Sequence, residues 1–315
     1  MVKFKLHFHA DCDGITSAYF VSRELDRLNF QYALYPSLGA SVELKGSNNI
    51  CLDISDVKTQ SPLNFSLDHH ITEKYPLFHA NFRQVGFEWP VSFDSYLLFG
   101  DLSLAWVAAI GIAADWCAQK VPVKFWDTVR EQWPQLKIPK KIEQLPLIKG
   151  PIGRMANMID ASVAVNKQSG AIYALRALQE SETPDDFLEG KGKAEKLVTL
   201  REKILKEVAT ILDKEEVFDE CVFLRFNSPY NIKSLVAGHA KERNPGKVII
   251  IAQNERDKIR VSFRGGDHLD VLVKELTEGI GGGGGHPQAS GGWIHHWHWE
   301  KFRDRLNKKL HCTLK

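Results

Sequence analysis

The sequence predicts an α/β protein in which a parallel-sheet N-terminal domain with covering helices is joined by a helix to a smaller α/β C-terminal domain. Length is the first observation behind this prediction, because 315 residues are enough for two domains that each bury a core. The second is that short apolar runs alternate with helical segments in the first half of the chain. The third is a change to closely spaced short strands from Val217 onward.

The first half begins with Val2–Phe8, where apolar and polar side chains alternate as on a half-buried strand. Asp13 and Gly14 interrupt this pattern, and Ile15–Leu25 then has the pattern of a helix. The stretch Leu97–Cys117 is long, apolar and rich in alanine, which predicts one buried helix. Further strands are expected at Tyr32–Tyr35, Asn49–Leu52 and Asn64–Leu67.

These patterns predict a first domain over residues 1–185, a linker helix over 186–216 and a second domain over 217–315. The linker is predicted to be helical because its apolar residues recur at steps of three and four: Leu197, Leu200, Ile204, Val208 and Ile211. The second domain should contain two strands and then a helix, at Val248–Ile251, Ile259–Phe263 and Leu269–Leu276.

The end of the chain carries two unusual stretches. Five glycines occupy residues 281–285, and the His-Pro-Gln-Ala-Ser-Gly that follows favours a loop that approaches a phosphate over a flexible linker. Further on, His296 and His298 alternate with Trp297 and Trp299, which predicts a terminal strand with one buried face.

Composition excludes several classes of protein. Hydrophobic residues at 43% and charged residues at 25% are typical of an ordinary soluble domain, and no run approaches the ~20 apolar residues of a membrane span. We therefore expect a cytoplasmic protein with no membrane partner. A net charge of +2 lacks the basic excess of proteins that track long nucleic acids, and fits a small anionic substrate met by local positive groups.

Acidic and imidazole groups follow several of the apolar runs. His7, His9, Asp11 and Asp13 lie at the end of the first, and the others are followed by Asp53, by Asp68, His69 and His70, and by Asp115. A parallel sheet gathers such groups at the carboxyl ends of its strands. Carboxylates mixed with one or two imidazoles suit Mn²⁺ or Mg²⁺, so the sequence predicts a binuclear metal site.

These motifs resemble those of the DHH phosphoesterases, the superfamily of RecJ exonucleases, oligoribonucleases, cyclic-dinucleotide phosphodiesterases and inorganic pyrophosphatases. The Asp68-His69-His70 triplet gives the first match. The glycine-rich stretch 281–291 resembles that of the DHH-associated C-terminal domain, and Val261–Arg264 resembles its strand ending in a phosphate-binding arginine. Together the motifs span residues 7 to 291, which is nearly the whole chain.

The resemblance implies a ligand set for two metal ions. Asp53 is expected to bridge them, Asp11 to hold one ion and Asp13 the other, with His69 and Asp115 completing the second ion. His7 and His9 compete for one further ligand position. We favour His7, because His-x-x-x-Asp-x-Asp is the spacing in family members that act on small nucleotides, and give His9 a substrate-contacting or supporting role.

The remaining predicted site residues act on the substrate. Asp68 should orient the imidazole that follows it, and His70 should contact the scissile phosphate rather than a metal. In the second domain, Arg264 and His286 are expected to grip a phosphate. They are joined there by backbone N–H groups of Gly283, Gly284 and Gly285.

The function implied is two-metal hydrolysis of phosphoester bonds in short nucleotides, with Mn²⁺ as cofactor and Mg²⁺ as the alternative ion. Candidate substrates are di- or oligonucleotides, linearised cyclic dinucleotides and 3′-phosphoadenosine 5′-phosphate. A RecJ-like single-strand exonuclease is the first alternative. A polyphosphate or pyrophosphate hydrolase and an inactive nucleic-acid-binding relative are the others. The sequence leaves a homodimer open as the assembly.

Overall fold

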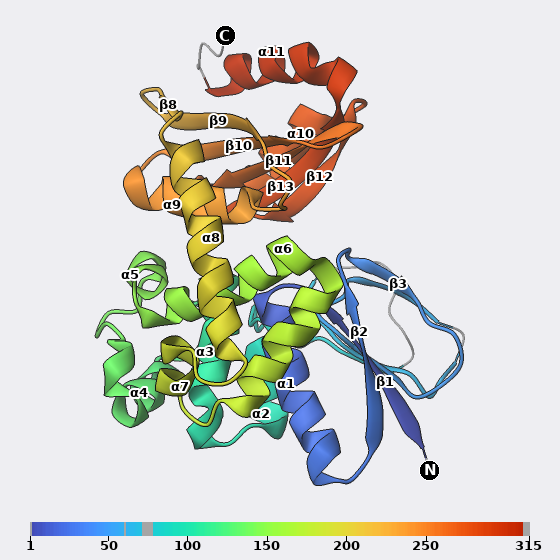
Figure 1. Cartoon of the computed structure of the whole chain (residues 1–315). Helices are drawn as coiled ribbons and strands as arrows, with labels where there is room; N and C mark the ends of the chain where they lie inside the picture. The colour runs from blue at the N-terminus through green and yellow to red at the C-terminus, as the bar shows by residue number, and fades with distance from the viewer. Residues whose placement is uncertain (1, 60, 71–77, 311–315) are drawn as a thin grey trace. The chain divides into compact units, whose positions relative to one another are not determined.

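The computed structural model describes residues 2–59, 61–70 and 78–310 (Figure 1). The chain divides into two compact units, Met1–Arg201 and Glu202–Lys315. The division falls within the helix α8 (Ala194–Leu212), and so within the segment 186–216.

The first unit is built on a parallel sheet with the strand order β2-β1-β4-β6-β7. The chain passes from β1 to β2 on one side and then returns to β4 on the other side of β1. Such a reversal leaves a crevice at the carboxyl ends of the two central strands, where α/β proteins bind ligands. The strands are β1 (Lys3–His9), β2 (Gln31–Ser37), β4 (Asn49–Leu52), β6 (Phe65–Leu67) and β7 (Phe78–Ala80), with a separate parallel pair β3 (Ser41–Glu43) and β5 (Asp56–Lys58).

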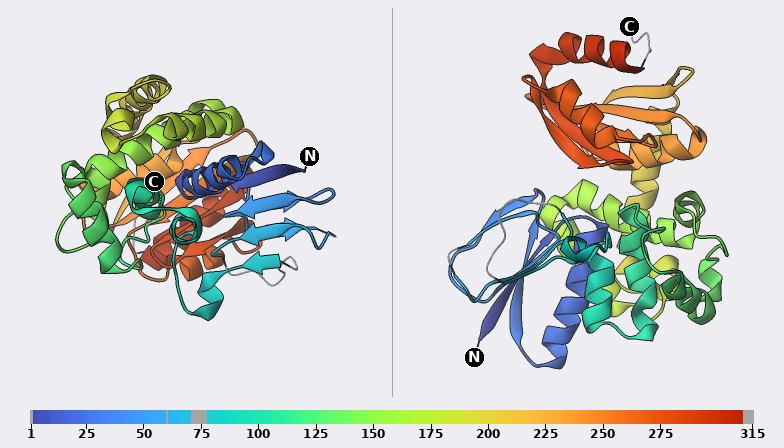
Figure 2. Two further views of the ribbon diagram at one scale, coloured as in Figure 1. Left: turned by 90° about the horizontal axis from the view of Figure 1, so that it is seen from below. Right: turned by 180° about the vertical axis from the view of Figure 1, so that it is seen from behind.

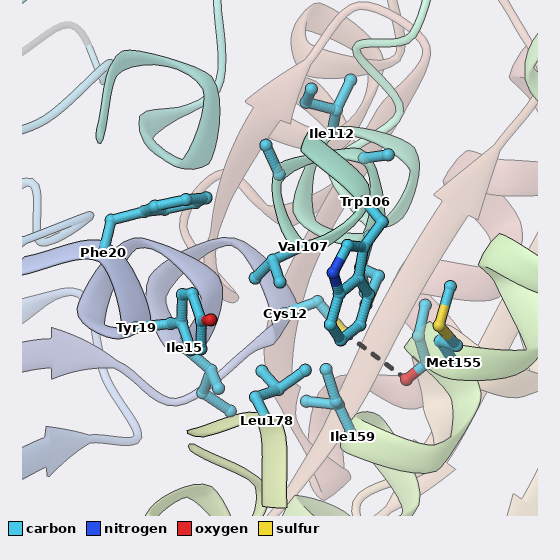
Figure 3. Close-up of a cluster of buried hydrophobic side chains, with 14 of the residues drawn as sticks. Cys12, Ile15, Tyr19, Phe20, Trp106, Val107, Ile112, Met155, Ile159 and Leu178 are labelled. Atoms are coloured by element: carbon cyan, nitrogen blue, oxygen red, sulfur yellow. Dashed lines mark hydrogen bonds between the residues drawn. The ribbon is translucent and has the colours of Figure 1, made fainter. Parts of the chain in front are cut away.

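Helices pack against one face of this sheet and supply most of the core of the first unit (Figure 2). Figure 3 shows Cys12 of α1 among large apolar side chains that include Trp106, Ile159 and Leu178, all fully buried, and Cys12 Sγ donates to Ala156 O at 3.4 Å. Among the described residues, no helix combines the length and apolarity needed to cross a membrane. Besides α8, the helices are α1 (Cys12–Arg27), η1 (Phe82–Val85), α2 (Val91–Phe99), η2 (Leu102–Leu104), α3 (Ala105–Ala114), α4 (Val123–Gln132), η3 (Pro134–Leu136), α5 (Gln144–Lys149), α6 (Pro151–Glu180) and α7 (Pro184–Glu189).

The prediction of one helix over Leu97–Cys117 is wrong. The chain leaves α2 at Gly100, and Asp101 then caps the short helix η2 by accepting from Ser103 N at 2.9 Å. A side chain at Gly100 would come within 2.5 Å of the Tyr96 ring, so the chain turns closely back on α2. Two packed helices therefore replace the single one, and the second ends with Asp115 as its C-cap.

The second unit contains a six-stranded mixed sheet of order β12-β13-β11-β10-β9-β8, in which only β9 and β10 pair in parallel. Its main core lies between the sheet and two helices, α10 and α11, and α9 lies over β10 and β11. The elements are β8 (Glu216–Val217), β9 (Cys221–Asn227), α9 (Lys233–Arg243), β10 (Val248–Asn254), β11 (Lys258–Arg264), α10 (Leu269–Thr277), β12 (Gly281–His286), β13 (Ala289–His295), η4 (His296–His298) and α11 (Trp299–Leu310).

Two predictions for the end of the chain are wrong. The glycines form the edge strand β12 instead of a loop, and Gly283 pairs with Gly292 of β13. A Cβ at Gly283 would lie 2.5 Å from Val273 Cγ1, so the bare strand allows α10 to pack against the sheet. The terminal strand ends at His295, and α11 begins at Trp299, whose indole is buried beside Phe302, while Trp297 remains 71% exposed.

Candidate metal centre

The predicted ligands of the first unit gather at one edge of the parallel sheet. Asp11 follows β1, Asp53 follows β4, and His69 follows β6. The strand register aligns these ends, because Phe8 pairs with Leu52 and Leu52 pairs with Leu67. The C-cap of α3 adds Asp115 to the same region, where its Oδ2 lies 3.8 Å from His69 Nδ1.

Three overlapping groups of side chains at this edge could hold metal ions. The groups are Asp53, His69 and His70; His9, Asp11 and Asp53; and Asp13, His69 and Asp115. The donor atoms of each group lie within 4.8 Å of one another. Asp53 belongs to the first two groups, and its carboxylate lies between imidazoles: Oδ2 is 3.6 Å from His9 Nδ1, and Oδ1 is 3.4 Å from His69 Nε2.

The backbone of Asp53 turns its carboxylate into the cluster. Its φ of 57° lies in the left-handed region, which Asp tolerates better than most residues. Asp53 N still donates to Leu67 O at 3.0 Å, so the turn follows directly after the last strand pairing. The side chain is 3% exposed, and its Oδ1 is buried without a well-formed hydrogen bond from any described residue. A buried carboxylate oxygen of this kind fits a position that coordinates a cation.

The start of α1 positions two more carboxylates. Asp11 is the N-cap, and its Oδ1 accepts from Gly14 N at 3.0 Å. Asp13 lies in the first turn and accepts from Val91 N at 2.9 Å and Ser92 N at 2.8 Å, at the N-terminus of α2. Backbone N–H groups at a helix N-terminus favour negative charge. Because the helix has already begun at Asp13, its carboxylate is directed to a different ligand group from that of Asp11.

The structure brings His9, and not His7, into the cluster. His9 Nδ1 lies 2.6 Å from Asp11 Oδ2. His7 Nε2 instead lies 3.0 Å from Asn49 Oδ1, and its ring stacks on Tyr35 with centroids 4.9 Å apart. The two histidines share a face of β1, but His7 is two residues, about 6.7 Å, further from the end of the strand. The preference for His7 as a ligand therefore does not match this geometry.

Asp68 contacts the second histidine of the triplet. Its Oδ1 lies 2.8 Å from His70 Nδ1, and its Oδ2 accepts from His70 N at 3.2 Å. Asp68 is fully buried, whereas the His70 side chain is 37% exposed, so the carboxylate fixes a ring that reaches solvent. Burial lowers the pKa of His70, but Asp68 and Asp53 outweigh this effect and raise it above its ordinary value.

The charges of the centre are arranged for cations. Burial lowers the pKa of His69, but Asp115, Asp53 and Asp13 outweigh it and raise that pKa well above its ordinary value. Burial raises the pKa of Asp53, yet His69 and His9 reverse the effect, so the pKa of Asp53 is lowered. Asp13 has a pKa raised well above its ordinary value by burial and by the carboxylates of Asp53 and Asp115. Protonation of these side chains therefore reduces the repulsion between the carboxylates. Divalent cations bound by the carboxylate oxygens and imidazole nitrogens would relieve the same repulsion.

Two carboxylates near the centre were not predicted from the sequence. Asp94 on α2 is fully buried, and neither carboxylate oxygen has a hydrogen-bond partner among the described residues. Burial raises the pKa of Asp94 to about 8, against a smaller opposing effect of His69. Asp160 on α6 accepts from Cys12 Sγ at 3.2 Å, and burial raises its pKa to about 7. The sequence feature that could have identified Asp94 is a single carboxylate within the largely apolar helix Val91–Phe99.

The predicted phosphate-binding residues of the second unit lie at the same register position on two strands of its sheet. Arg264 and His286 both pair with Ala289 of β13, from the strands on either side of it. Their backbones are therefore two strand spacings, about 10 Å, apart. Gly283, Gly284 and Gly285 precede His286 on β12. Arg264 Nη1 donates to Phe263 O at 2.9 Å.

Comparisons with known proteins agree with this architecture. The family model described as the DHHA1 domain matches residues 221–312, and no curated protein matches the chain. RecJ from Thermus thermophilus, solved with Mn²⁺, is similar with a TM-score of 0.67 and 15% identity over 99% of this chain and 52% of that one. The chain thus spans about half the length of that RecJ.

Two other solved structures match over most of both chains. The DHH domain of a protein described as a member of a family of ribosomal proteins has a TM-score of 0.66 and 16% identity, covering 98% of this chain and 86% of that one. The pGpG-specific phosphodiesterase PggH from Vibrio cholerae has a TM-score of 0.52 and 12% identity, with 99% of each chain covered. Residues 221–312 thus match the DHHA1 domain, and the chain as a whole shares the fold of these RecJ and DHH-domain structures.

Proposed function

We propose that the chain is a phosphoesterase that uses two divalent cations, Mn²⁺ or Mg²⁺, to hydrolyse a phosphoester bond in short nucleotides. The observation that carries this proposal is the Asp53 carboxylate. It is buried and belongs to two potential ligand groups at the ends of parallel strands. Two-metal hydrolases need a carboxylate that can bridge both ions, and the ions supply an activated water and charge stabilisation at the phosphate.

The side chains present divide between two ions around Asp53. His9 and Asp11 would hold one ion together with Asp53. Asp13, His69 and Asp115 would hold the other, with Asp53 as the shared ligand. Asp53 lies 3.4 Å from His69 through Oδ1, so its carboxylate connects the two sets.

His70 is proposed to act on the phosphate. Asp68 holds its Nδ1 and favours the protonated ring, since the pKa of His70 is raised by Asp68 and Asp53 against burial. In the hydrolysis, water oxygen adds to phosphorus and gives up one proton to solvent, the bond from phosphorus to the leaving oxygen breaks, and that oxygen takes a proton. A protonated imidazole of His70 can donate a hydrogen bond to the phosphate and supply this proton.

Short nucleotides are the proposed substrate class for three reasons. The net charge of +2 provides few contacts for a long strand. Arg264, Gly283–Gly285 and His286 form a compact stretch of sheet suited to one phosphate group. One similar structure is described as a pGpG-specific phosphodiesterase, and it is covered over its whole length. The similarity to RecJ makes a single-strand exonuclease the second candidate.

A substrate panel with Mn²⁺, with products resolved by length, tests the proposal. It should contain pApA, a cyclic dinucleotide, 3′-phosphoadenosine 5′-phosphate, polyphosphate and a long single strand. We expect pApA or 3′-phosphoadenosine 5′-phosphate to be hydrolysed fastest. Asp53→Asn should abolish this activity, while Asp56→Asn, at an exposed residue of β5 three positions further on, should retain it. Faster cleavage of the long strand, suppressed steeply by salt, would favour the exonuclease, and full activity of Asp53→Asn would exclude the two-metal mechanism.

A further inference from the structure

One face of the sheet in the second unit carries an unusual set of side chains. Along β11, Ile259, Val261 and Phe263 are fully buried in the core with α10 and α11. Because side chains alternate along a strand, Arg260 and Arg264 lie on the opposite face. Both arginines are partly exposed, so this face presents positive charge.

An indole lies beside Arg260 on this face. Trp293 of β13 pairs with Arg260 on one side and with Gly282 of the edge strand on the other. A Cβ at Gly282 would lie 3.4 Å from the Trp293 Nε1, so the indole lies over a position that has no side chain. Trp293 remains partly exposed, and Lys258 Nζ lies 5.8 Å from its ring centroid.

Lys233 adds a third positive charge close to Arg260 and Arg264. Lys233, the first residue of α9, has its pKa lowered to about 8 by burial and then by the positive charges of Arg260 and Arg264. The acidic group that opposes them is Glu255, whose Oε2 lies 3.3 Å from Arg260 Nε. A lysine whose charged form is disfavoured by burial and by two neighbouring arginines fits a site that is completed by an anion.

We infer that Trp293, Arg260 and Lys233 form a nucleotide subsite, in which the indole stacks on a base and the two cations bind the adjoining phosphate. Indole–base stacking tolerates any base, because each has an aromatic face. Arg264 and Arg260 are four residues apart on one strand, about 13 Å, so the subsite is separate from the phosphate group assigned to Arg264. The inference rests on the proposed function and extends it: the substrate has at least two nucleotides, and one base is held by stacking.

Binding measurements on the full chain in EDTA separate this inference from hydrolysis. The probes are pApA and an abasic dinucleotide with the same phosphates. We expect Trp293→Leu to raise the Kd of pApA by about 5- to 100-fold, the usual contribution of one stacked base, and to leave the Kd of the abasic probe unchanged. Trp293→Phe should retain most of the affinity, because phenylalanine can still stack. Trp297→Leu is the matched control, since Trp297 is an exposed tryptophan of the adjoining segment.

A second pair of variants tests the contribution of the cations to phosphate binding. Arg260→Gln should weaken both probes, because both carry the phosphate, whereas Arg256→Gln in the exposed β10–β11 turn should weaken neither. Equal wild-type affinity for the two probes would overturn the inference. So would an unchanged Kd in Trp293→Leu, an equal loss for both probes in that variant, or an equal effect of Trp297→Leu. If pApA is hydrolysed but these changes have no selective effect, the inference fails alone; if no nucleotide is hydrolysed, the proposed function fails.

Discussion

Replacing Asp94 with asparagine should change how the stability of the metal-free protein depends on pH. Asp94 is fully buried, and its pKa of about 8 lies far above the ~3.9 of an unfolded chain. Between these values the folded protein holds a proton that the unfolded chain has released, so stability decreases as pH rises. Each pKa unit corresponds to about 1.4 kcal/mol, and the whole interval to roughly 6 kcal/mol. The loss begins near pH 4 and is complete above about pH 8.

Asparagine carries no titrating proton, so Asp94→Asn removes this loss. Urea unfolding in EDTA should show a constant difference in the free energy of unfolding below about pH 4, and a difference that changes in favour of the variant as the pH rises toward about 8. The other titrating groups of the centre are present in both proteins and cancel in the comparison. Asp257→Asn, in an exposed turn, is the matched control and should follow the wild type at every pH. Parallel pH profiles for wild type and Asp94→Asn would refute the reasoning.

Three further predictions concern the site residues. His9→Ala should reduce metal occupancy, measured by elemental analysis, more than His7→Ala, because His9 lies 2.6 Å from Asp11 whereas His7 contacts Asn49; an equal or greater loss in His7→Ala would restore His7 as the ligand. His70→Ala should keep both ions while kcat falls on the order of 10²–10⁴-fold, and loss of metal would make it a ligand instead. Arg264→Ala should raise KM with metal occupancy unchanged, as steady-state kinetics and the same elemental analysis will show.

The ends of β4 and β6 were predictable because hydrophobicity alone marks them. The strand expected at Asn49–Leu52 has those same bounds, and Asp53 follows it. The choice between His7 and His9 was not predictable from the sequence. The alternation of side chains along a strand places both histidines on one face of β1 and does not show where the strand ends. In the structure β1 ends at His9, because Asp11 caps α1 directly afterwards.

The strand β12 could not be predicted from its five glycines. Glycine has no side chain whose periodicity could indicate a strand, and its low strand preference favoured a loop. Pairing with β13 and the approach of Val273 from α10 determine its conformation, and both are tertiary contacts. Asp94 was missed for a related reason, since an apolar helix gives no indication of which neighbour a single carboxylate will face.

The two units concentrate opposite charges, although the net charge of the chain is only +2. The first buries Asp13 and Asp53 together, and they repel one another unless cations or protons intervene. The second brings Lys233 close to Arg260 and Arg264, and burial together with their positive charges lowers the pKa of Lys233. Each cluster is destabilising by itself and becomes favourable when a ligand of opposite charge binds. Divalent cations satisfy the first requirement and nucleotide phosphates the second, which is the physical reason for proposing a metal-dependent enzyme that acts on short nucleotides.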